Sequence, residues 1–243
     1  NPQFPAEEVT LPSKGLLYSK DSPLKSGKIE MKYMTAREED ILTNANYIKN
    51  GIAIDKLLQS LIITPINYEE LLIGDKNAIM VAARILAYGP QYSFVLAGES
   101  IDVDLSEVNN KEIDSKKYKN GNKFDLKLPS GNEVTFKLLT HQDEINIERE
   151  LTGLKKINKN DSSQVTTRLK KMITSVNGST EIKDIREYVD KYMLATDARA
   201  LRKEYTNLQP DVDLSYNYIR EDGGEEVIDI PVGLNFFWPD DRV

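Results

Sequence analysis

The sequence predicts an α+β fold built from two similar strand–helix–hairpin units, with antiparallel β-hairpins and an extended N-terminal arm. Short stretches alternate apolar and polar residues with a period of two, which is typical of strands. Longer stretches place apolar residues at helical spacing and end at Gly or Pro. The features of residues 27–105 recur in the same order in 131–232, which indicates an internal duplication. We expect an arm over 1–26, one unit over 27–123 and another over 124–243.

The N-terminal segment is predicted to be a docking arm. Its four prolines disfavour a helix, and LPSKG reads as a turn between short extended pieces. Four apolar side chains make it too hydrophobic for a free tail, so we expect them to dock on this protein or on a partner: Leu11, Leu16, Leu17 and Tyr18.

The first unit begins with a strand that changes sharply into a helix. Residues 29–33 alternate apolar and charged side chains. Thr35 and Glu38 then have the spacing of a capping box, in which the two side chains satisfy free amides at the helix start. The pattern predicts a helix over 35–49 and a second over about 53–63.

The first unit is predicted to end with a long helix and a hairpin. Asp75 is a suitable N-cap for the helix, and Pro90 follows its end. Strands at 92–95 and 101–105 alternate around an Ala-Gly turn. Residues 106–123 are polar and poor in apolar side chains, which favours a loop or flexible insertion.

The second unit repeats this order. A hairpin over about 124–138 precedes Thr140, which forms a weaker capping box with Asp143 because Asp is shorter than Glu. His141, the only histidine, follows the cap and is expected on the surface. Asp197 matches Asp75 as a predicted cap. The remaining helices are expected at 140–154, 164–175, 181–194 and 197–207, and the final strands at 214–218 and 227–230.

Three consecutive aromatic residues close the chain. Each large aromatic can bury about 150–250 Å², so leaving all three in water is unfavourable. They either fill this protein's own core or anchor it in a partner, and we expect the partner. These residues are Phe236, Phe237 and Trp238.

The composition excludes several kinds of chemistry. With no cysteine and one histidine in 243 residues, the chain lacks thiolate nucleophiles and the ligands of ordinary structural zinc, so we expect no metal and no cofactor. No apolar run is long enough to cross a membrane, and the sequence does not begin with a secretory signal. The only basic cluster, Arg168–Lys171, is expected to be a solvated helix face and not a nucleic-acid site.

Carboxylate clusters do not indicate catalysis. Glu38–Asp40, Asp143–Glu144 and Glu181–Asp184 occupy expected helix starts, where capping and the helix dipole account for them. Acidic residues between 211 and 226 lack the order of an EF-hand loop. We therefore expect no enzymatic activity and no small-molecule substrate.

The chain resembles baseplate hub subunits and hub assembly proteins of T-even-like contractile-tailed phages. The resemblance covers nearly the whole chain and rests on these segments: LPSKGLLY (11–18), MTAREEDIL (34–42), IDKLLQSLI (54–62), LLIGDKNAIMVAARILAYG (71–89), FDLKLPSGNEVTFKLLTHQDE (124–144), ATDARALR (195–202) and NFFWP (235–239).

The resemblance implies a non-enzymatic structural or assembly protein that binds other tail proteins. It would act in the host cytoplasm during assembly and could remain in the virion. Alternatives are a transient assembly chaperone and, less favoured, a carboxylate-dependent hydrolase. Relatives look as though they carry cysteine pairs in the two aromatic hairpins. The equivalent turns here, at 95–98 and 219–223, have none, so a metal role does not transfer.

Overall fold

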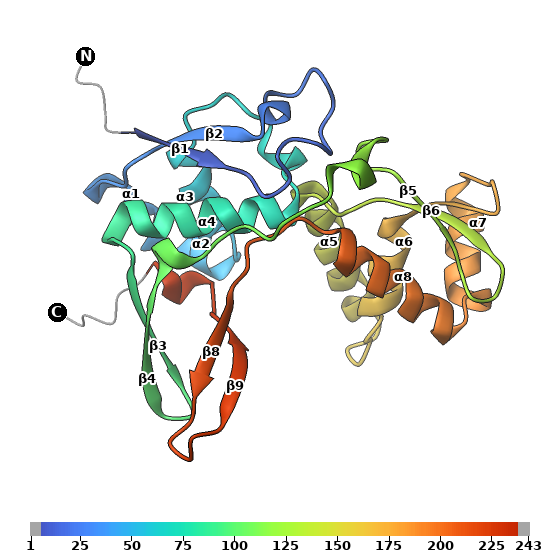
Figure 1. Cartoon of the computed structure of the whole chain (residues 1–243). Coiled ribbons are helices and arrows are strands. Elements are labelled where there is room, and N and C mark those ends of the chain that lie inside the picture. Colours follow the sequence, from blue (N-terminus) through green and yellow to red (C-terminus); the bar gives the residue numbers. More distant parts are fainter. Residues whose placement is uncertain (1–5, 238–243) are drawn as a thin grey trace.

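The structure is a computed structural model that describes residues 6–237 (Figure 1). It is α+β, as predicted. The helices are α1 Ala36–Leu42, α2 Ala45–Lys49, α3 Ala53–Leu61, α4 Ile73–Tyr88, α5 His141–Ile157, α6 Gln164–Met172, α7 Ile182–Glu187 and α8 Ala195–Leu208. The strands are β1 Ala6–Thr10, β2 Lys28–Lys32, β3 Gln91–Leu96, β4 Glu99–Asp104, β5 Phe124–Lys127, β6 Glu133–Phe136, β7 Ile173–Val176, β8 Ser215–Ile219 and β9 Glu225–Asp229.

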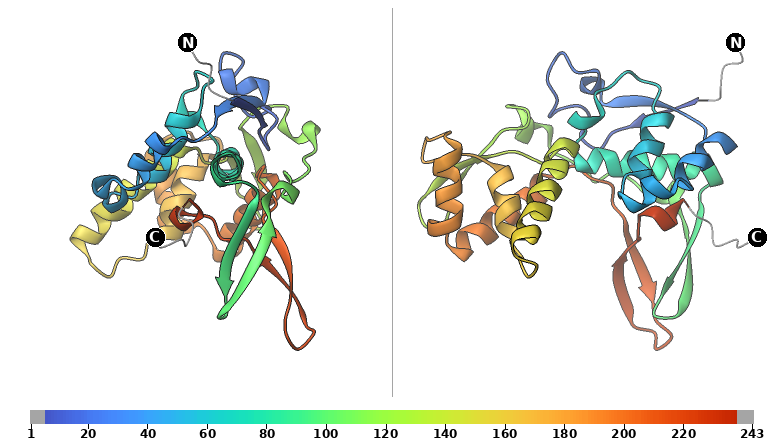
Figure 2. Two further views of the ribbon diagram at one scale, coloured as in Figure 1. Left: turned by 90° about the vertical axis from the view of Figure 1, so that its left-hand side faces the viewer. Right: turned by 180° about the vertical axis from the view of Figure 1, so that it is seen from behind.

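Two lobes make up the molecule, and Figure 2 shows them from two further sides. The first contains α1–α4 beneath the β1–β2 hairpin. The second contains α5–α8 and the three-stranded sheet β5–β6–β7. None of the helices in the described part of the chain is long and apolar enough to cross a membrane.

The N-terminal segment was predicted to be an extended arm that docks on this protein or on a partner, and its described residues belong to the first lobe. β1 pairs along its whole length with β2, from Ala6 opposite Lys32 to Thr10 opposite Lys28. The predicted alternation of β2 is confirmed, since Ile29 and Met31 are buried while their neighbours face outward. Prolines elsewhere in the segment did not prevent a strand over 6–10, which contains none.

The predicted helix over 35–49 is two helices. The Asn44 side chain accepts hydrogen bonds from the amides of Asn46 and Tyr47, at 3.0 and 3.1 Å, and so starts α2 anew. Asn is a strong N-cap, and its effect outweighs the continuous apolar spacing. The next predicted helix is confirmed as α3, after which Ile62 forms a bridge with Met31 of β2.

The C-terminal hairpin returns to the first lobe. β8–β9 hangs beside β3–β4 in Figure 1, although the sequence places it after α8 of the second lobe. The connection crosses the start of α4, where Val212 bridges to Asn110. The Tyr92 hydroxyl of β3 donates to the carbonyl of Pro231 at 3.2 Å. The hairpins predicted at the end of each unit, β3–β4 and β8–β9, are both present. The β3–β4 hairpin turns at Ala97-Gly98, where both φ angles are positive, as a tight hairpin turn requires.

Two predictions for the second half need correction. The helix expected over 164–175 ends at Met172, and the β-branched run that follows forms β7 against β6. The helix expected over 181–194 is α7 followed by a π-helical turn, Tyr188–Tyr192.

Residues 106–123 contain no long element, as expected, but contacts hold them to the rest of the fold. Leu105 and Tyr118, which lie at or near the ends of two short 3₁₀ turns, are buried. The Tyr118 hydroxyl donates to the carbonyl of Leu208 at 2.7 Å. Of the two alternatives, a loop or a flexible insertion, the structure shows a loop, which the buried Tyr118 fastens to the fold although the segment is polar on average.

Gly74 permits the crossing of the C-terminal connection over α4. A Cβ there would lie 1.7 Å from the Pro210 carbonyl oxygen, so we expect Gly74→Ala to lower the free energy of unfolding by about 3 kcal/mol, the scale of overpacking against backbone. The control is Gly153→Ala in α5, where a Cβ meets nothing. Losing a mid-helix glycine there should stabilise the protein by about 0.5–1 kcal/mol. Urea unfolding of both variants checks this, and equal effects would contradict it.

Candidate functional site

The apolar residues expected to dock the N-terminal segment lie in this chain's own core. Leu11, Leu17 and Tyr18 are buried and Leu16 is half-buried. Of the two alternatives, docking on this protein or on a partner, the structure shows the first for Leu11, Leu17 and Tyr18, so their assignment as partner-binding residues is not supported by the folded chain. The sequence pattern predicted that these residues pack against a surface, but it did not identify that surface as the core of this chain.

The C-terminal aromatics give the same result. Phe236 and Phe237 are each 1 % exposed, and the Phe236 ring meets Tyr92 edge to face, with centroids 4.8 Å apart. Phe236 also meets Phe237 edge to face, and both rings are covered by this chain, so the prediction of a partner anchor is wrong for these two residues. Trp238 lies outside the described residues.

A buried carboxylate organises the first lobe. Asp75 accepts from the Ser13 amide at 2.9 Å and from the hydroxyls of Ser13 and Tyr18, both at 2.6 Å. The Tyr18 hydroxyl in turn accepts from the Leu72 amide at 3.0 Å. We call Ser13, Tyr18, Leu72 and Asp75 the Asp75 cluster. It joins the N-terminal segment to the start of α4 across about sixty positions of sequence.

A matching arrangement lies in the second lobe. Asp197 accepts from the Ser130 amide at 3.0 Å, from the Ser130 hydroxyl, and from the Tyr188 hydroxyl at 3.4 Å. We call these three residues the Asp197 cluster. Each aspartate is the third residue of its helix and completely buried. Each serine follows a Leu-Pro pair in the sequence.

The assignment of Asp75 and Asp197 as helix caps is therefore wrong. Leu72 and Leu194 occupy the N-cap positions, and the aspartates reach distant serines. Burial raises the pKa of Asp75 despite the hydrogen bonds from Ser13 and Tyr18 that favour its ionised form. A cap is recognisable from the four residues around it, whereas a distant partner leaves no local signal.

The two predicted capping boxes are present, and each carries a lysine that the sequence reasoning missed. Glu38 accepts from the Thr35 amide at 2.8 Å and pairs with Lys32. Asp143 accepts from the Thr140 amide at 3.0 Å and pairs with Lys137 at 2.9 Å. Thr140 also accepts from the Asp143 amide at 3.3 Å, so the box closes with the shorter Asp, and its expected weakness relative to the Glu38 box stays a prediction.

The lobes join where the segment between β6 and α5 meets the start of α4. Leu72 bridges to Thr140, and the His141 amide donates to the Leu71 carbonyl at 2.8 Å. His141 is 7 % exposed, so its placement on the surface was wrong. Its ring packs edge-on against Tyr68 at 4.8 Å, and burial together with the adjacent Lys76 lowers its pKa. This histidine is a packing residue of the junction.

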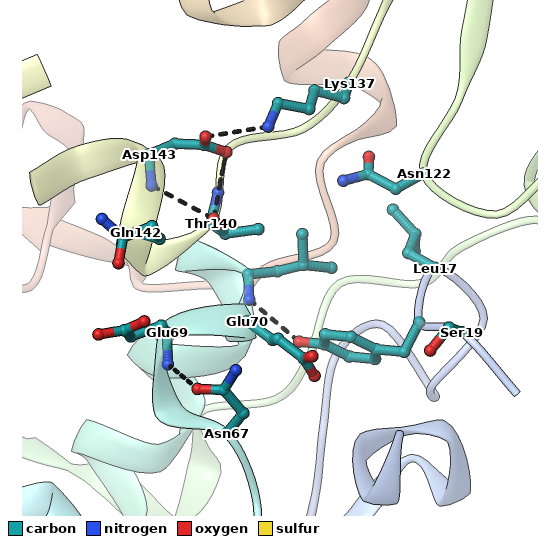
Figure 3. A pocket seen from close by; sticks show the side chains of 12 residues that line it. Leu17, Ser19, Asn67, Glu69, Glu70, Asn122, Lys137, Thr140, Gln142 and Asp143 are labelled. Carbon is teal, nitrogen blue, oxygen red and sulfur yellow. Dashed lines mark hydrogen bonds and ion pairs between the residues drawn. The ribbon is translucent and has the colours of Figure 1, made fainter. Parts of the chain in front are cut away.

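A polar cleft of about 440 Å³ opens beside this junction (Figure 3). The first lobe contributes Glu69 and Glu70, and the second contributes Lys137 and Asp143. Glu69 and Glu70 are exposed, whereas carboxylates that act as general acids or bases need shelter. Asp143 is committed to Thr140 and Lys137.

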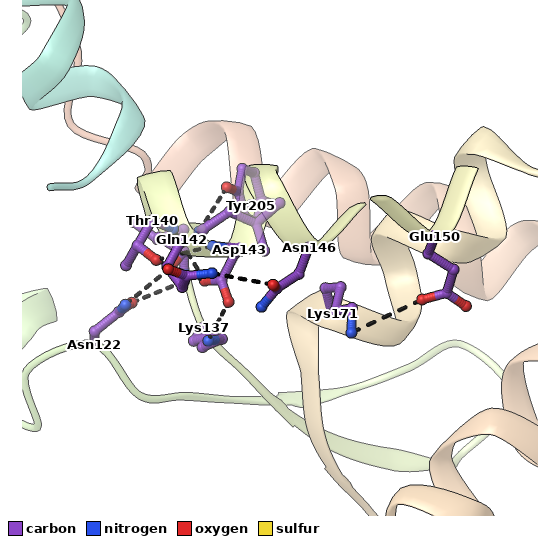
Figure 4. Close-up of polar contacts among 11 residues, drawn as sticks. Asn122, Lys137, Thr140, Gln142, Asp143, Asn146, Glu150, Lys171 and Tyr205 are labelled. Atoms are coloured by element: carbon purple, nitrogen blue, oxygen red, sulfur yellow. Dashed lines mark hydrogen bonds and ion pairs between the residues drawn. The ribbon is translucent and has the colours of Figure 1, made fainter. Parts of the chain in front are cut away.

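Other polar side chains near the cleft also form hydrogen bonds with neighbouring residues of this chain (Figure 4). The Asn122 amide group both donates to and accepts from the backbone of Leu138, and Gln142 donates to Asn146 at 3.0 Å. Over residues 6–237 no three His, Asp or Glu side chains are grouped to hold a metal ion. The arrangement is suited to holding two lobes together, and the absence of enzymatic activity stays a prediction.

Comparison with models of known protein families, with curated proteins and with solved structures finds no match to this chain.

The Glu38 box should make stability depend on pH. Burial alone would raise the pKa of this carboxyl, but hydrogen bonds from Lys32 and Thr35 outweigh it and lower the pKa from 4.5 to about 2. The stabilisation is therefore present above the ordinary pKa and is lost as the pH falls through the folded value. We expect Glu38→Gln to cost about 2 kcal/mol at neutral pH and little at about pH 2, where the carboxyl of the folded protein becomes protonated.

The exposed Asp40 on the same helix supplies the control, since Asp40→Asn should change stability little at either pH. Urea titrations at both pH values measure the effect. A Glu38→Gln cost that stays constant with pH would show that the carboxylate charge is unimportant.

Proposed function

We propose that this protein is a non-enzymatic structural or assembly component of a phage tail baseplate, in the hub region, and that it acts by binding other tail proteins. The observation that carries the proposal is the position, in the structure, of the segments on which the resemblance to baseplate proteins rests. LPSKGLLY contains Ser13 and Tyr18 of the Asp75 cluster, and ATDARALR contains the buried Asp197. The segments of the resemblance thus contain fold-building contacts, as expected of a protein whose shape is its function.

We further propose that the two halves of the sequence, 27–105 and 131–232, descend from one duplicated unit. Three matched features support it: the Ser–Asp contacts, the Thr–carboxylate boxes with their lysines, and a helix followed by an aromatic hairpin. Comparing sequence profiles of the two halves across relatives should align Asp75 with Asp197 and Thr35 with Thr140. Alignment in a different register would remove this proposal.

The decisive measurement is quantitative mass spectrometry of purified virions from infected cells. We expect this protein at a fixed ratio to the baseplate proteins, because a structural subunit is retained at a copy number set by symmetry. Its presence in assembly intermediates but absence from virions would instead support a transient chaperone. Tails that assemble normally when its gene is deleted would contradict both roles.

A further inference from the structure

The two hairpins carry the net charge of the whole protein. Residues 91–104 contain three carboxylates and no cation, and residues 215–229 contain five carboxylates and a single arginine. Together they contribute a net charge of −7, which equals the formal charge of the chain. The remaining residues are therefore neutral overall, and the negative field concentrates where β3–β4 and β8–β9 hang from the first lobe (Figure 1).

An apolar pair lies exposed within this charged region. Ile219 and Val227 are 67 % and 68 % exposed. The register pairs Ile219 with Glu225 and Asn217 with Val227, so both apolar side chains share the outer face of the hairpin with Glu225. Among the described residues, Asp222 is the only carboxylate of the two hairpins in an ion pair, with Arg220.

β9 also has backbone N–H and C=O groups along its outer edge that no strand pairs with in the described part of the chain. β8 and β9 pair only with each other in the part of the chain that the structure describes, so the outer edge of each retains unpaired backbone groups. β8 lies toward the other hairpin, since Tyr218 donates to Glu99. β9 is exposed at every position except the half-buried Ile228.

We propose that the edge and outer face of β9 bind an extended, basic segment of a partner protein by strand addition. A strand beside β9 would place cations opposite Glu225 and Asp229 and an apolar side chain opposite Val227. The occupant is therefore a segment that presents a Lys or Arg, a β-branched or aromatic residue and a second Lys or Arg at every second position, so that all three face the same side of the strand. A second copy of this hairpin is disfavoured because it would bring like charges together. The inference stands on this surface and does not depend on the baseplate proposal.

The test is selection of peptides of about ten residues, the length of a strand, from a random library on the full-length protein. We expect enriched sequences to carry a basic, an apolar and a second basic residue at every second position. A synthesised enriched peptide should lose at least about tenfold in affinity for the Ile219→Ser/Val227→Ser variant. Raising the salt concentration should weaken its binding, and N-methylation of alternate amides should abolish it.

The matched control is Ile182→Ser/Leu194→Ser, which removes exposed apolar side chains from the second lobe and should leave binding unchanged. Because all four positions are exposed, thermal melting should show both variants folded. Absence of enrichment, enrichment of acidic peptides, or binding that survives Ile219→Ser/Val227→Ser would overturn the proposal. So would a dimer in sedimentation that this variant dissolves, since the occupant would then be a second copy.

Discussion

The buried carboxylate of Asp75 is the constraint on which the first lobe depends. A carboxylate removed from water must be given hydrogen-bond donors, because an unpaired one is strongly destabilising. Ser13 and Tyr18 supply them, and Tyr18 also receives the amide of Leu72. The N-terminal segment is thereby held against the start of α4, where its apolar side chains enter the core. The segment that the sequence suggested to be an arm therefore packs over the core of the first lobe.

A buried aspartate with a serine partner also occurs in the second lobe, and it lies in a series of contacts that leads to the junction between the lobes. Asp197 holds the turn between β5 and β6 against α8 through Ser130. The strand leaving that hairpin runs to Thr140, which bridges to Leu72 beside the Asp75 cluster. Two polar clusters and one backbone junction therefore connect elements that are distant in sequence, and the cleft next to Lys137 is the space left between them.

The net charge differs between the body of the protein and the two hairpins β3–β4 and β8–β9. The body of the protein is neutral overall, and two of its partly buried ion pairs, Lys32 with Glu38 and Lys137 with Asp143, serve helix starts. The hairpins are anionic, and β9 exposes Val227 beside carboxylates. An unpaired acidic edge resists pairing with its own copies while remaining complementary to a basic strand.

The sequence by itself determined the features that depend on residues within a few positions of one another. The alternation of β2, the Ala97-Gly98 turn and the Thr35 and Thr140 boxes were predictable because their contacts are local. Only the tertiary structure decided where Asp75 and Asp197 find their partners, that Phe236 is a core residue, and that β9 returns to the first lobe. These contacts join residues distant in sequence, and neither composition nor periodicity specifies which distant surfaces meet.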